Sequence, residues 1–326
     1  MIAVLAVPAG GTSQGIGVPA GFRVQTFARG LSQPTAMAYG PDNRIYVTQN
    51  GGTVVAIRSG TRKPVVLARG LRIPLGLAWH GHSLFVSEQG RLERFTLKNG
   101  HLVGRRVLVK GIPYGEHQQD NVVWHDGRLY WGSGSTCDAC VERDTRSATV
   151  LSLRPDGSDL RVVARGLRNP YGLAVQPKTG RLYATVNGQD DLDRTGDPEP
   201  ADMLVVVRRG AFYGWPRCWP SARTLHLAGS CSGVTAPAAY LEPHSSADGL
   251  AFWRGSAFVA EWGQYLSHRF GRRVVRVDLR PNGTARRVSV FASGFAHPLA
   301  LLVAQRGGLL VADWGPGVVY RISAHG

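Results

Sequence analysis

The chain has 326 residues, with 42 glycines, 19 prolines, 8 tryptophans and 43% hydrophobic residues, which is typical of a turn-rich, β-rich protein with a sizeable core. Its formal net charge is +16, from 38 Lys and Arg against 22 Asp and Glu, but these charges form no basic helix, zinc finger or aromatic RNA-binding signature. We therefore expect no nucleic-acid partner. The arginines form either an ordinary solvated surface or a field that attracts an anionic cofactor or substrate.

The N-terminal stretch, residues 1–9, is apolar and ends in small residues, like the tail of a secretory signal peptide, but no positive segment precedes it. We expect residues 1–19 to be a signal-peptide remnant or a flexible N-terminus, and residues 20–326 to form one domain. No other stretch approaches the length of a transmembrane helix, so no membrane span is expected.

A two-part pattern recurs six times along this domain. Its first part is a turn with glycine or an apolar residue shortly before proline, and it begins at Gly30, Gly70, Gly111, Gly166, Leu241 and Gly294. Its second part is a short aromatic or β-branched strand, and it lies at 44–47, 83–86, 128–131, 181–184, 256–259 and 308–311. The repeat length of roughly 40 to 75 residues fits four-stranded blades with insertions. We predict an all-β, six-bladed β-propeller of antiparallel blades around a central channel.

The four cysteines form two local pairs, Cys137 with Cys140 and Cys218 with Cys231. A C-x-x-C pair can be a redox or zinc site, but neither a thioredoxin-like pattern nor a second close pair accompanies it. The spacing therefore favours two local disulfides and a periplasmic or secreted protein.

Polar residues with chemical potential stand in the loops that would lie at one face of the channel. His117 directly precedes the predicted strand 122–124, and from its position alone it is either a general base or a hydrogen-bonded rim histidine. Arg168 and Asn169 open the fourth unit, and Asn187 begins the matching downstream loop.

Four motifs in order resemble the glucose/sorbosone dehydrogenase family of soluble, six-bladed quinoprotein sugar dehydrogenases. They are Glu116-His117-Gln118, residues 166–174 with Arg168-Asn169-Pro170, Asn187-Gly188, and residues 210–216 with Tyr213-Gly214-Trp215-Pro216. The resemblance covers residues 20–323.

The resemblance implies pyrroloquinoline quinone (PQQ) and Ca²⁺ at the channel mouth, and an aldose sugar or related alcohol as substrate. His117 would take the proton of the substrate hydroxyl while hydride passes to PQQ, and Arg168 would stabilise the negative charge on the quinone oxygen. Asn169 and Asn187 would contact the cofactor. Calcium would bind the backbone oxygens of Gly188 and Gln189, because it prefers oxygen ligands.

Further residues are assigned to the cofactor on the same ground: His244, one of Arg269 and Arg272, and His297. Asp190 and Asp191 are either further calcium ligands or solvated loop carboxylates. Two positions depart from the family, since His297 stands where many members have arginine and Gln189 where some have proline. No C-x-x-C-H haem motif follows Cys137, so electrons would leave to a separate acceptor.

Two other classes of function remain open. A calcium-dependent lactonase propeller would hydrolyse a sugar lactone with channel carboxylates such as Glu88, Glu261 and Asp313. A non-catalytic propeller would bind a protein or polysaccharide on its rim.

Overall fold

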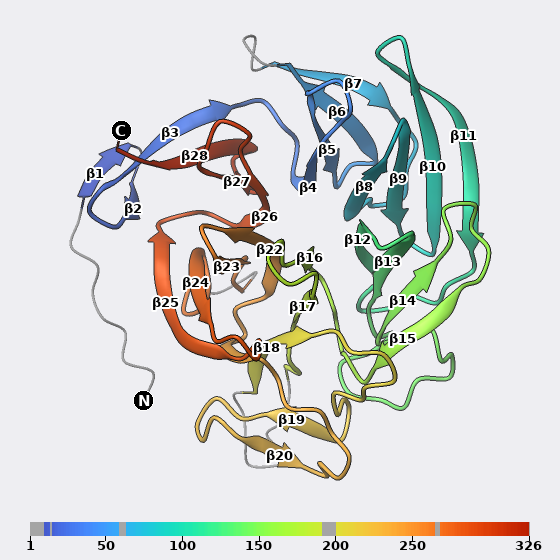
Figure 1. Cartoon of the computed structure of the whole chain (residues 1–326), viewed down its shortest axis with the longest axis vertical. Coiled ribbons are helices and arrows are strands. Elements are labelled where there is room, and N and C mark those ends of the chain that lie inside the picture. Colours follow the sequence, from blue (N-terminus) through green and yellow to red (C-terminus); the bar gives the residue numbers. More distant parts are fainter. Residues whose placement is uncertain (1–9, 14, 59–62, 191–199, 265–267, 326) are drawn as a thin grey trace.

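The structure is a computed structural model that describes residues 10–13, 15–58, 63–190, 200–264 and 268–325. All regular secondary structure in these ranges is β, and most of it forms six four-stranded antiparallel blades in a ring around a channel (Figure 1). The predicted six-bladed propeller is therefore confirmed.

Each blade runs from an innermost strand at the channel outward; in the first five blades the strands follow one another in chain order, and in the sixth the outer strand comes from the N-terminal region. The blades are, in order, β4 (Pro34–Tyr39), β5 (Ile45–Gln49), β6 (Thr53–Ile57) and β7 (Pro64–Ala68); β8 (Gly76–His80), β9 (Ser83–Glu88), β10 (Arg91–Lys98) and β11 (His101–Lys110); β12 (Gln119–His125), β13 (Arg128–Ser133), β14 (Thr149–Leu153) and β15 (Arg161–Arg165); β16 (Leu173–Val175), β17 (Leu182–Val186), β18 (Ala201–Val206) and β21 (Ala239–Pro243); β22 (Ala247–Trp253), β23 (Ser256–Glu261), β24 (Arg273–Leu279) and β25 (Ala285–Ser293); and β26 (Pro298–Val303), β27 (Leu309–Asp313), β28 (Val318–Ala324) and β3 (Phe22–Ala28).

The sixth blade closes the ring with strands from both ends of the chain. Its outer strand β3 comes from the N-terminal region and pairs antiparallel with β28, with Val24 opposite Ile322. Both residues are at most 5% exposed and lie in the same apolar cluster. The two ends are thus joined through β-sheet hydrogen bonds and a shared core.

Part of the segment that we expected to precede the propeller is packed against it. The strands β1 (Gly10–Ser13) and β2 (Ile16–Val18) extend the fifth blade, where Gly17 pairs with Ser293 of β25. The side chains of Ile16 and Val18 are 1% exposed. The leader expected in residues 1–9 lies outside the described residues, and its removal stays a prediction.

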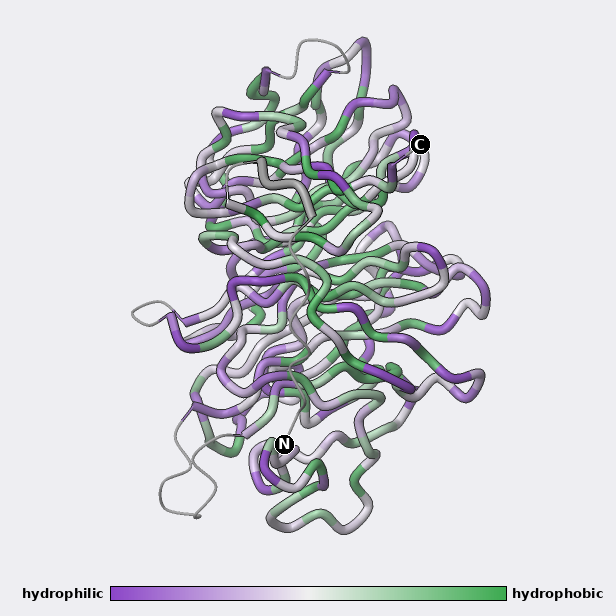
Figure 2. The backbone as a smooth tube through the Cα atoms, turned by 90° about the vertical axis from the view of Figure 1, so that its left-hand side faces the viewer, coloured by the Kyte–Doolittle hydropathy of each residue, from purple (hydrophilic) through white to green (hydrophobic). Residues whose placement is uncertain are grey.

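The core lies between neighbouring blades. The second strands β5, β9, β17, β23 and β27 are buried along nearly their whole length, because each is covered on both faces by adjacent blades. These are the aromatic and β-branched strands of the repeated pattern. In the side view, hydrophobic segments run through the middle of the molecule and many of its outer loops are hydrophilic (Figure 2).

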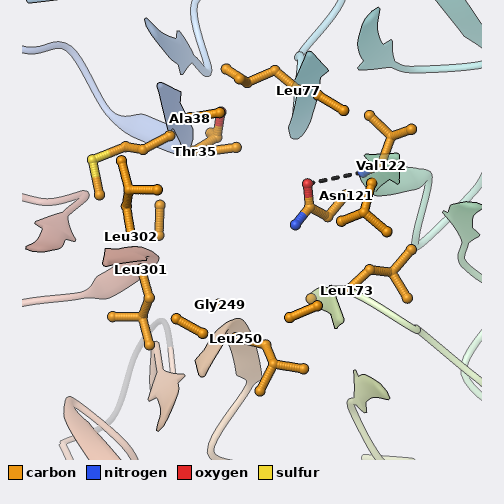
Figure 3. Close-up of a pocket in the computed structure, with 18 of the residues that line it drawn as sticks. Thr35, Ala38, Leu77, Asn121, Val122, Leu173, Gly249, Leu250, Leu301 and Leu302 are labelled. Carbon is orange, nitrogen blue, oxygen red and sulfur yellow. Dashed lines mark hydrogen bonds between the residues drawn. The ribbon is translucent and has the colours of Figure 1, made fainter. Parts of the chain in front are cut away.

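The innermost strands enclose an apolar channel of about 400 Å³ (Figure 3). Its wall includes Leu77, Leu173, Leu250 and Leu301, one from each of four blades. Glycine is needed where blades approach closely, since a Cβ on Gly249 would lie 2.1 Å from the carbonyl oxygen of Leu299. Tight convergence of the inner strands brings the loops at their ends together.

Both predicted disulfides are present, Cys137–Cys140 and Cys218–Cys231. The second one closes an insertion in the fourth blade that contains the hairpin of β19 (Cys218–Pro220) and β20 (Leu227–Gly229), which projects from the ring (Figure 1). A search of the described residues finds no helix with the length and apolar character needed to cross a membrane.

Candidate functional site

A polar cavity of about 260 Å³ lies where loops of the third, fourth and fifth blades meet. Five of the predicted site residues line it: His117, Arg168, Asn187, Gly188 and His244. The remainder of its wall includes residues that the sequence did not single out for this role, namely Asp202, Ser246, Trp262, Gly263 and Gln264, together with Asp190. The cavity therefore gathers, from positions far apart in the chain, a histidine base candidate, a guanidinium and several oxygen donors.

His117 sits just before β12, on a loop held against the end of β13. Its backbone N–H donates to the carbonyl oxygen of Ser135 (3.1 Å), and its Nδ1 lies 3.0 Å from the Ser135 hydroxyl oxygen. Burial, followed by the nearby Arg168 charge, lowers the pKa of His117 to about 4. The imidazole is therefore neutral at neutral pH and able to accept a proton.

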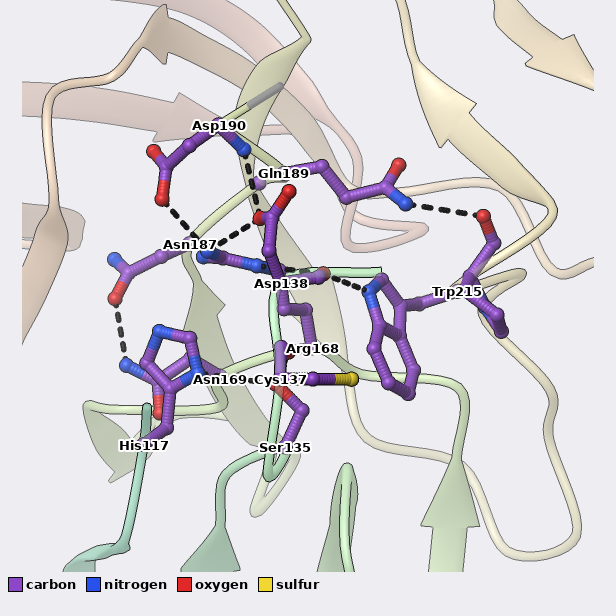
Figure 4. Close-up of polar contacts among 12 residues, drawn as sticks. His117, Ser135, Cys137, Asp138, Arg168, Asn169, Asn187, Gln189, Asp190 and Trp215 are labelled. Carbon is purple, nitrogen blue, oxygen red and sulfur yellow. Dashed lines mark hydrogen bonds and ion pairs between the residues drawn. The ribbon is translucent and has the colours of Figure 1, made fainter. Parts of the chain in front are cut away.

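Arg168 is nearly buried, with its side chain 4% exposed, and is surrounded by acceptors (Figure 4). Its Nη2 lies 2.7 Å from a carboxylate oxygen of both Asp138 and Asp190, and its Nε donates to the Asp138 carbonyl oxygen at 3.1 Å. The same carbonyl accepts the indole N–H of Trp215 at 2.9 Å. These contacts fix the guanidinium at the cavity wall and pair it with two carboxylates, of which Asp190 also lines the cavity.

Asn169 and Asn187 form a pair that connects two loops of the fourth blade. The Asn169 amide donates to the Asn187 side-chain oxygen at 2.7 Å, and Asn187 donates in turn to the carbonyl oxygen of Ala247 at 3.1 Å. Among the described residues, the buried Oδ1 of Asn169 has no hydrogen-bond partner. A buried oxygen without a donor is costly, so this atom fits a site completed by a ligand or water.

The backbone at Gly188 and Gln189 carries the predicted calcium oxygens. The N–H of Gly188 donates to Asp202 at 2.7 Å, and Asp202 also accepts from the backbone of Ala247 and the hydroxyl of Ser245. No described residue donates to the carbonyl oxygen of Gly188 or of Gln189. Two adjacent carbonyl oxygens with no donor among the described residues, beside the carboxylate of Asp202, are a ligand set that suits a hard cation.

His244 faces the same cavity from the loop before β22, with its Nδ1 3.5 Å from Asp190. Its ring packs at 5.6 Å from that of Phe270, and the guanidinium of Arg269 lies over Phe270 at 4.7 Å. Arg269 thus contacts Phe270, the neighbour of His244, and is not among the residues that line the cavity. Asp191 lies outside the described residues.

The structure places Arg272 and His297 behind the segment 262–264, which forms the wall of the cavity. Arg272 donates to the carbonyl oxygens of Gln264 and Ala296. The His297 ring stacks on Trp262 with centroids 3.9 Å apart, and its Nδ1 lies 3.1 Å from the Trp262 carbonyl oxygen. Neither side chain lines the cavity; both support residues that do.

The carboxylates that a lactonase would require have other partners. Glu88 and Asp313 accept backbone N–H groups from the loops that open their blades, at 2.8 and 2.6 Å for Asp313 from residues 296 and 297. Glu261 pairs with Arg273 at 2.5 Å. All three are at most 2% exposed. Their contacts explain them as structural caps of the blade ends, and none of them lines the polar cavity.

Three residues that contact the site were not predicted from the sequence. Ser135 contacts His117, Asp138 contacts Arg168, and Asp202 accepts the backbone N–H of Gly188. Asp138 lies between Cys137 and Cys140, so a disulfide loop next to the third blade was the visible signal. Trp262 follows directly after β23 and carried no distinguishing pattern.

Comparison with known proteins identifies a family and a fold. The family model described as glucose/sorbosone dehydrogenase matches residues 82–311. The aldose sugar dehydrogenase YliI of Escherichia coli is 23% identical over 309 residues, covering 76% of this chain and 77% of that protein.

Two solved structures have the same fold. The PQQ-bound aldose sugar dehydrogenase of Streptomyces coelicolor has a TM-score of 0.75 and 22% identity, and the match covers 94% of this chain and all of that one (100%). The calcium structure of the Trichoderma reesei carbohydrate-active enzyme of family AA12 has a TM-score of 0.85 and 16% identity, over 98% and 99% of the two chains. At these identities the structural matches establish the fold.

Proposed function

The chain belongs to the glucose/sorbosone dehydrogenase family, and we propose that it is a PQQ- and calcium-dependent dehydrogenase that oxidises an aldose sugar or related alcohol at its CH–OH group. The observation that carries the proposal is the cavity in which a neutral, buried histidine and a buried arginine lie together with Asn187, His244 and the backbone of Gly188. When bound, PQQ supplies the two-electron acceptor for this chemistry.

The residues of the cavity fit such a cofactor. PQQ is a planar anion, and Arg168 places a guanidinium at the cavity wall, held in one position by Asp138 and Asp190, that would donate hydrogen bonds to it. Gly188 lines the cavity, and the carbonyl oxygens of Gly188 and Gln189, to which no described residue donates, would hold a calcium ion. Asn169 does not line the cavity and would act through its hydrogen bond to Asn187. Asn187 and His244 supply polar side chains on two further sides.

His117 is the group that takes the proton of the substrate hydroxyl. It is neutral at neutral pH because burial and Arg168 lower its pKa to about 4, so it is in the form that accepts a proton. Arg168 stabilises negative charge that develops during the reaction, an effect that is strong in a site with little water. Electrons then leave to a separate acceptor.

Two disulfides in the described chain favour an oxidising compartment, and we propose a periplasmic or secreted location.

The test is to titrate chelator-treated protein with PQQ in the presence and absence of Ca²⁺, following the melting temperature and aldose-dependent reduction of a dye. We expect stabilisation by PQQ that requires calcium, together with dye reduction. His117→Ala should abolish dye reduction and keep the PQQ-dependent stabilisation, while His125→Ala, at the far end of the strand β12 that follows His117, should retain both. Absence of binding at micromolar PQQ would reject the proposed cofactor. Turnover by His117→Ala would reject His117 as the base.

A further inference from the structure

The geometry points to a positioning role for the loop closed by the Cys137–Cys140 disulfide. We propose that this loop fixes which nitrogen of His117 carries the proton and how Arg168 is oriented, with Ser135 and Asp138 as the positioning residues. Its consequence for catalysis rests on the function proposed above, but its effect on His117 is a property of the apoprotein.

The Ser135 hydroxyl determines the protonation pattern of the histidine ring. A hydroxyl has one proton to donate, and that of Ser135 goes to the carbonyl oxygen of Cys137 at 2.7 Å. The contact of 3.0 Å with His117 Nδ1 must then be an N–H donated by the ring to the Ser135 oxygen. Nδ1 therefore carries the hydrogen and Nε2 keeps the lone pair that a general base needs.

Asp138 holds the arginine through two of its own atoms. Its carboxylate lies 2.7 Å from Arg168 Nη2, and its carbonyl oxygen accepts Arg168 Nε at 3.1 Å. The backbone N–H of Asp190 and the indole of Trp215 donate to the same two groups, both at 2.9 Å. Because the Arg168 side chain is only 4% exposed, a fixed counter-charge is needed to keep the guanidinium in one position.

The Cys137–Cys140 disulfide lies in the loop that contacts both His117, through Ser135, and Arg168, through Asp138. The Cys137 carbonyl, which orients Ser135, and Asp138, which orients Arg168, belong to consecutive residues (Figure 4). Both residues lie in the ring that the Cys137–Cys140 bond closes. On the outer side of this ring, Thr136 is held by Glu142, which accepts its N–H at 2.6 Å and its hydroxyl at 2.8 Å. One short loop thus positions both candidate catalytic residues.

The length of the loop separates this role from general stabilisation. The Cys137–Cys140 bond spans 3 positions of sequence, whereas Cys218–Cys231 spans 13. A disulfide restricts the unfolded chain less when its loop is shorter, so the first bond contributes less stability than the second. Removing each bond should therefore give opposite profiles of stability and activity.

The first experiment is direct and needs no cofactor. In apoprotein with ¹⁵N-labelled histidine, the nitrogen chemical shifts of His117 distinguish the two neutral tautomers. We expect the Nδ1–H form at neutral pH, and a shift toward the Nε2–H form in Ser135→Ala and in the double variant Cys137→Ser/Cys140→Ser. The Nε2–H form in the unmodified protein, or no change in these variants, would overturn the assignment.

The second experiment uses protein loaded with PQQ and calcium. Cys137→Ser/Cys140→Ser and Asp138→Asn should lower aldose turnover about tenfold to a hundredfold, as expected for misplaced catalytic groups, with PQQ binding retained. The control Cys218→Ser/Cys231→Ser should lower the melting temperature more and turnover per folded molecule less. Unchanged turnover in both loop variants would overturn the positioning role. If the unmodified protein oxidises no aldose, the proposed function fails, and the tautomer measurement still decides the role of Ser135.

Discussion

A histidine that is both buried and next to an arginine is unusual for a structural residue, because burial and the arginine charge each oppose protonation of the imidazole. In His117, burial and the Arg168 charge destabilise only the protonated imidazole, and the neutral ring has a hydrogen-bond partner in Ser135. This environment keeps the imidazole available as a base across the neutral and mildly acidic range. A solvated rim histidine would instead titrate near its ordinary pKa.

The pH dependence of turnover follows from this environment. The basic form of His117 exists above its pKa, so turnover should persist as the pH falls and be lost only around pH 4. Arg168→Gln removes one of the two causes that lower this pKa, while burial remains, so the acidic limb should move upward toward the ordinary histidine value near 6.5. The measurement is the pH–turnover profile, with the ¹⁵N titration of His117 in the apoprotein beside it.

Arg165→Gln is the matched control for that prediction. Arg165 lies three residues earlier, and its guanidinium packs on Phe212 at 4.7 Å. Its removal should leave the acidic limb in place. A limb near pH 6.5 in the unmodified protein would contradict the assignment of His117 as a buried base.

The same low pKa of His117 implies that the unfolded chain binds more protons between about pH 4 and 6.5, so His117 makes stability fall as the pH decreases through that window.

At the scale of strands and loops, buried carboxylates terminate several blades by accepting backbone N–H groups. Glu88 does so in the second blade, Asp313 in the sixth and Asp202 in the fourth. A carboxylate accepts several hydrogen bonds and donates none, which suits the exposed N–H groups of a turning loop. Only Asp202 lines the polar cavity and fixes the backbone whose carbonyl oxygens remain free.

Asp202→Asn and Glu88→Gln distinguish the role of a blade-end cap from a role at the proposed calcium site. Each variant loses acceptor capacity beside a buried N–H, so each should lower the free energy of unfolding by about 1 to 3 kcal/mol. Asp202→Asn should in addition weaken calcium-dependent PQQ binding about tenfold or more, since the Gly188 backbone loses its partner. Denaturant unfolding and calcium titration measure the two effects. An equal calcium affinity in both variants would remove Asp202 from the metal site.

How far the sequence predicted these elements depends on the range of the interactions involved. The Gly–Pro openings and the strands after them are local patterns, so they predicted the six blades, and the close spacing of the cysteines predicted the two disulfides that are observed. His117 and Arg168 were found because they belong to motifs. Asp138 was not, because its contact with Arg168 joins residues 30 positions apart through a loop whose shape no local pattern encodes. The position of His297 behind Trp262 likewise depends on packing between blades.

At the scale of the whole molecule, the site depends on closure of the ring. The cavity takes its residues from the third, fourth and fifth blades, and the ring is completed in the sixth, where β3 and β28 join the two ends of the chain. Each blade covers the core of the next, so opening this seam exposes apolar surface on two blades at once. Stability of the seam and integrity of the site should therefore be linked.

A covalent link across the seam tests that dependence. Arg23 of β3 and Ser323 of β28 are directly opposite each other, with their side chains 3.4 Å apart, and they are separated by 300 positions of sequence. A disulfide in Arg23→Cys/Ser323→Cys would close a very long loop in the unfolded chain, so we expect about 2 to 4 kcal/mol of stabilisation and a melting temperature higher by at least about 4 °C. The single-cysteine variants are the controls, and calorimetry under oxidising conditions is the measurement. If the cross-linked protein melts at the temperature of the controls, the seam is not where the ring opens, and unfolding begins at another blade.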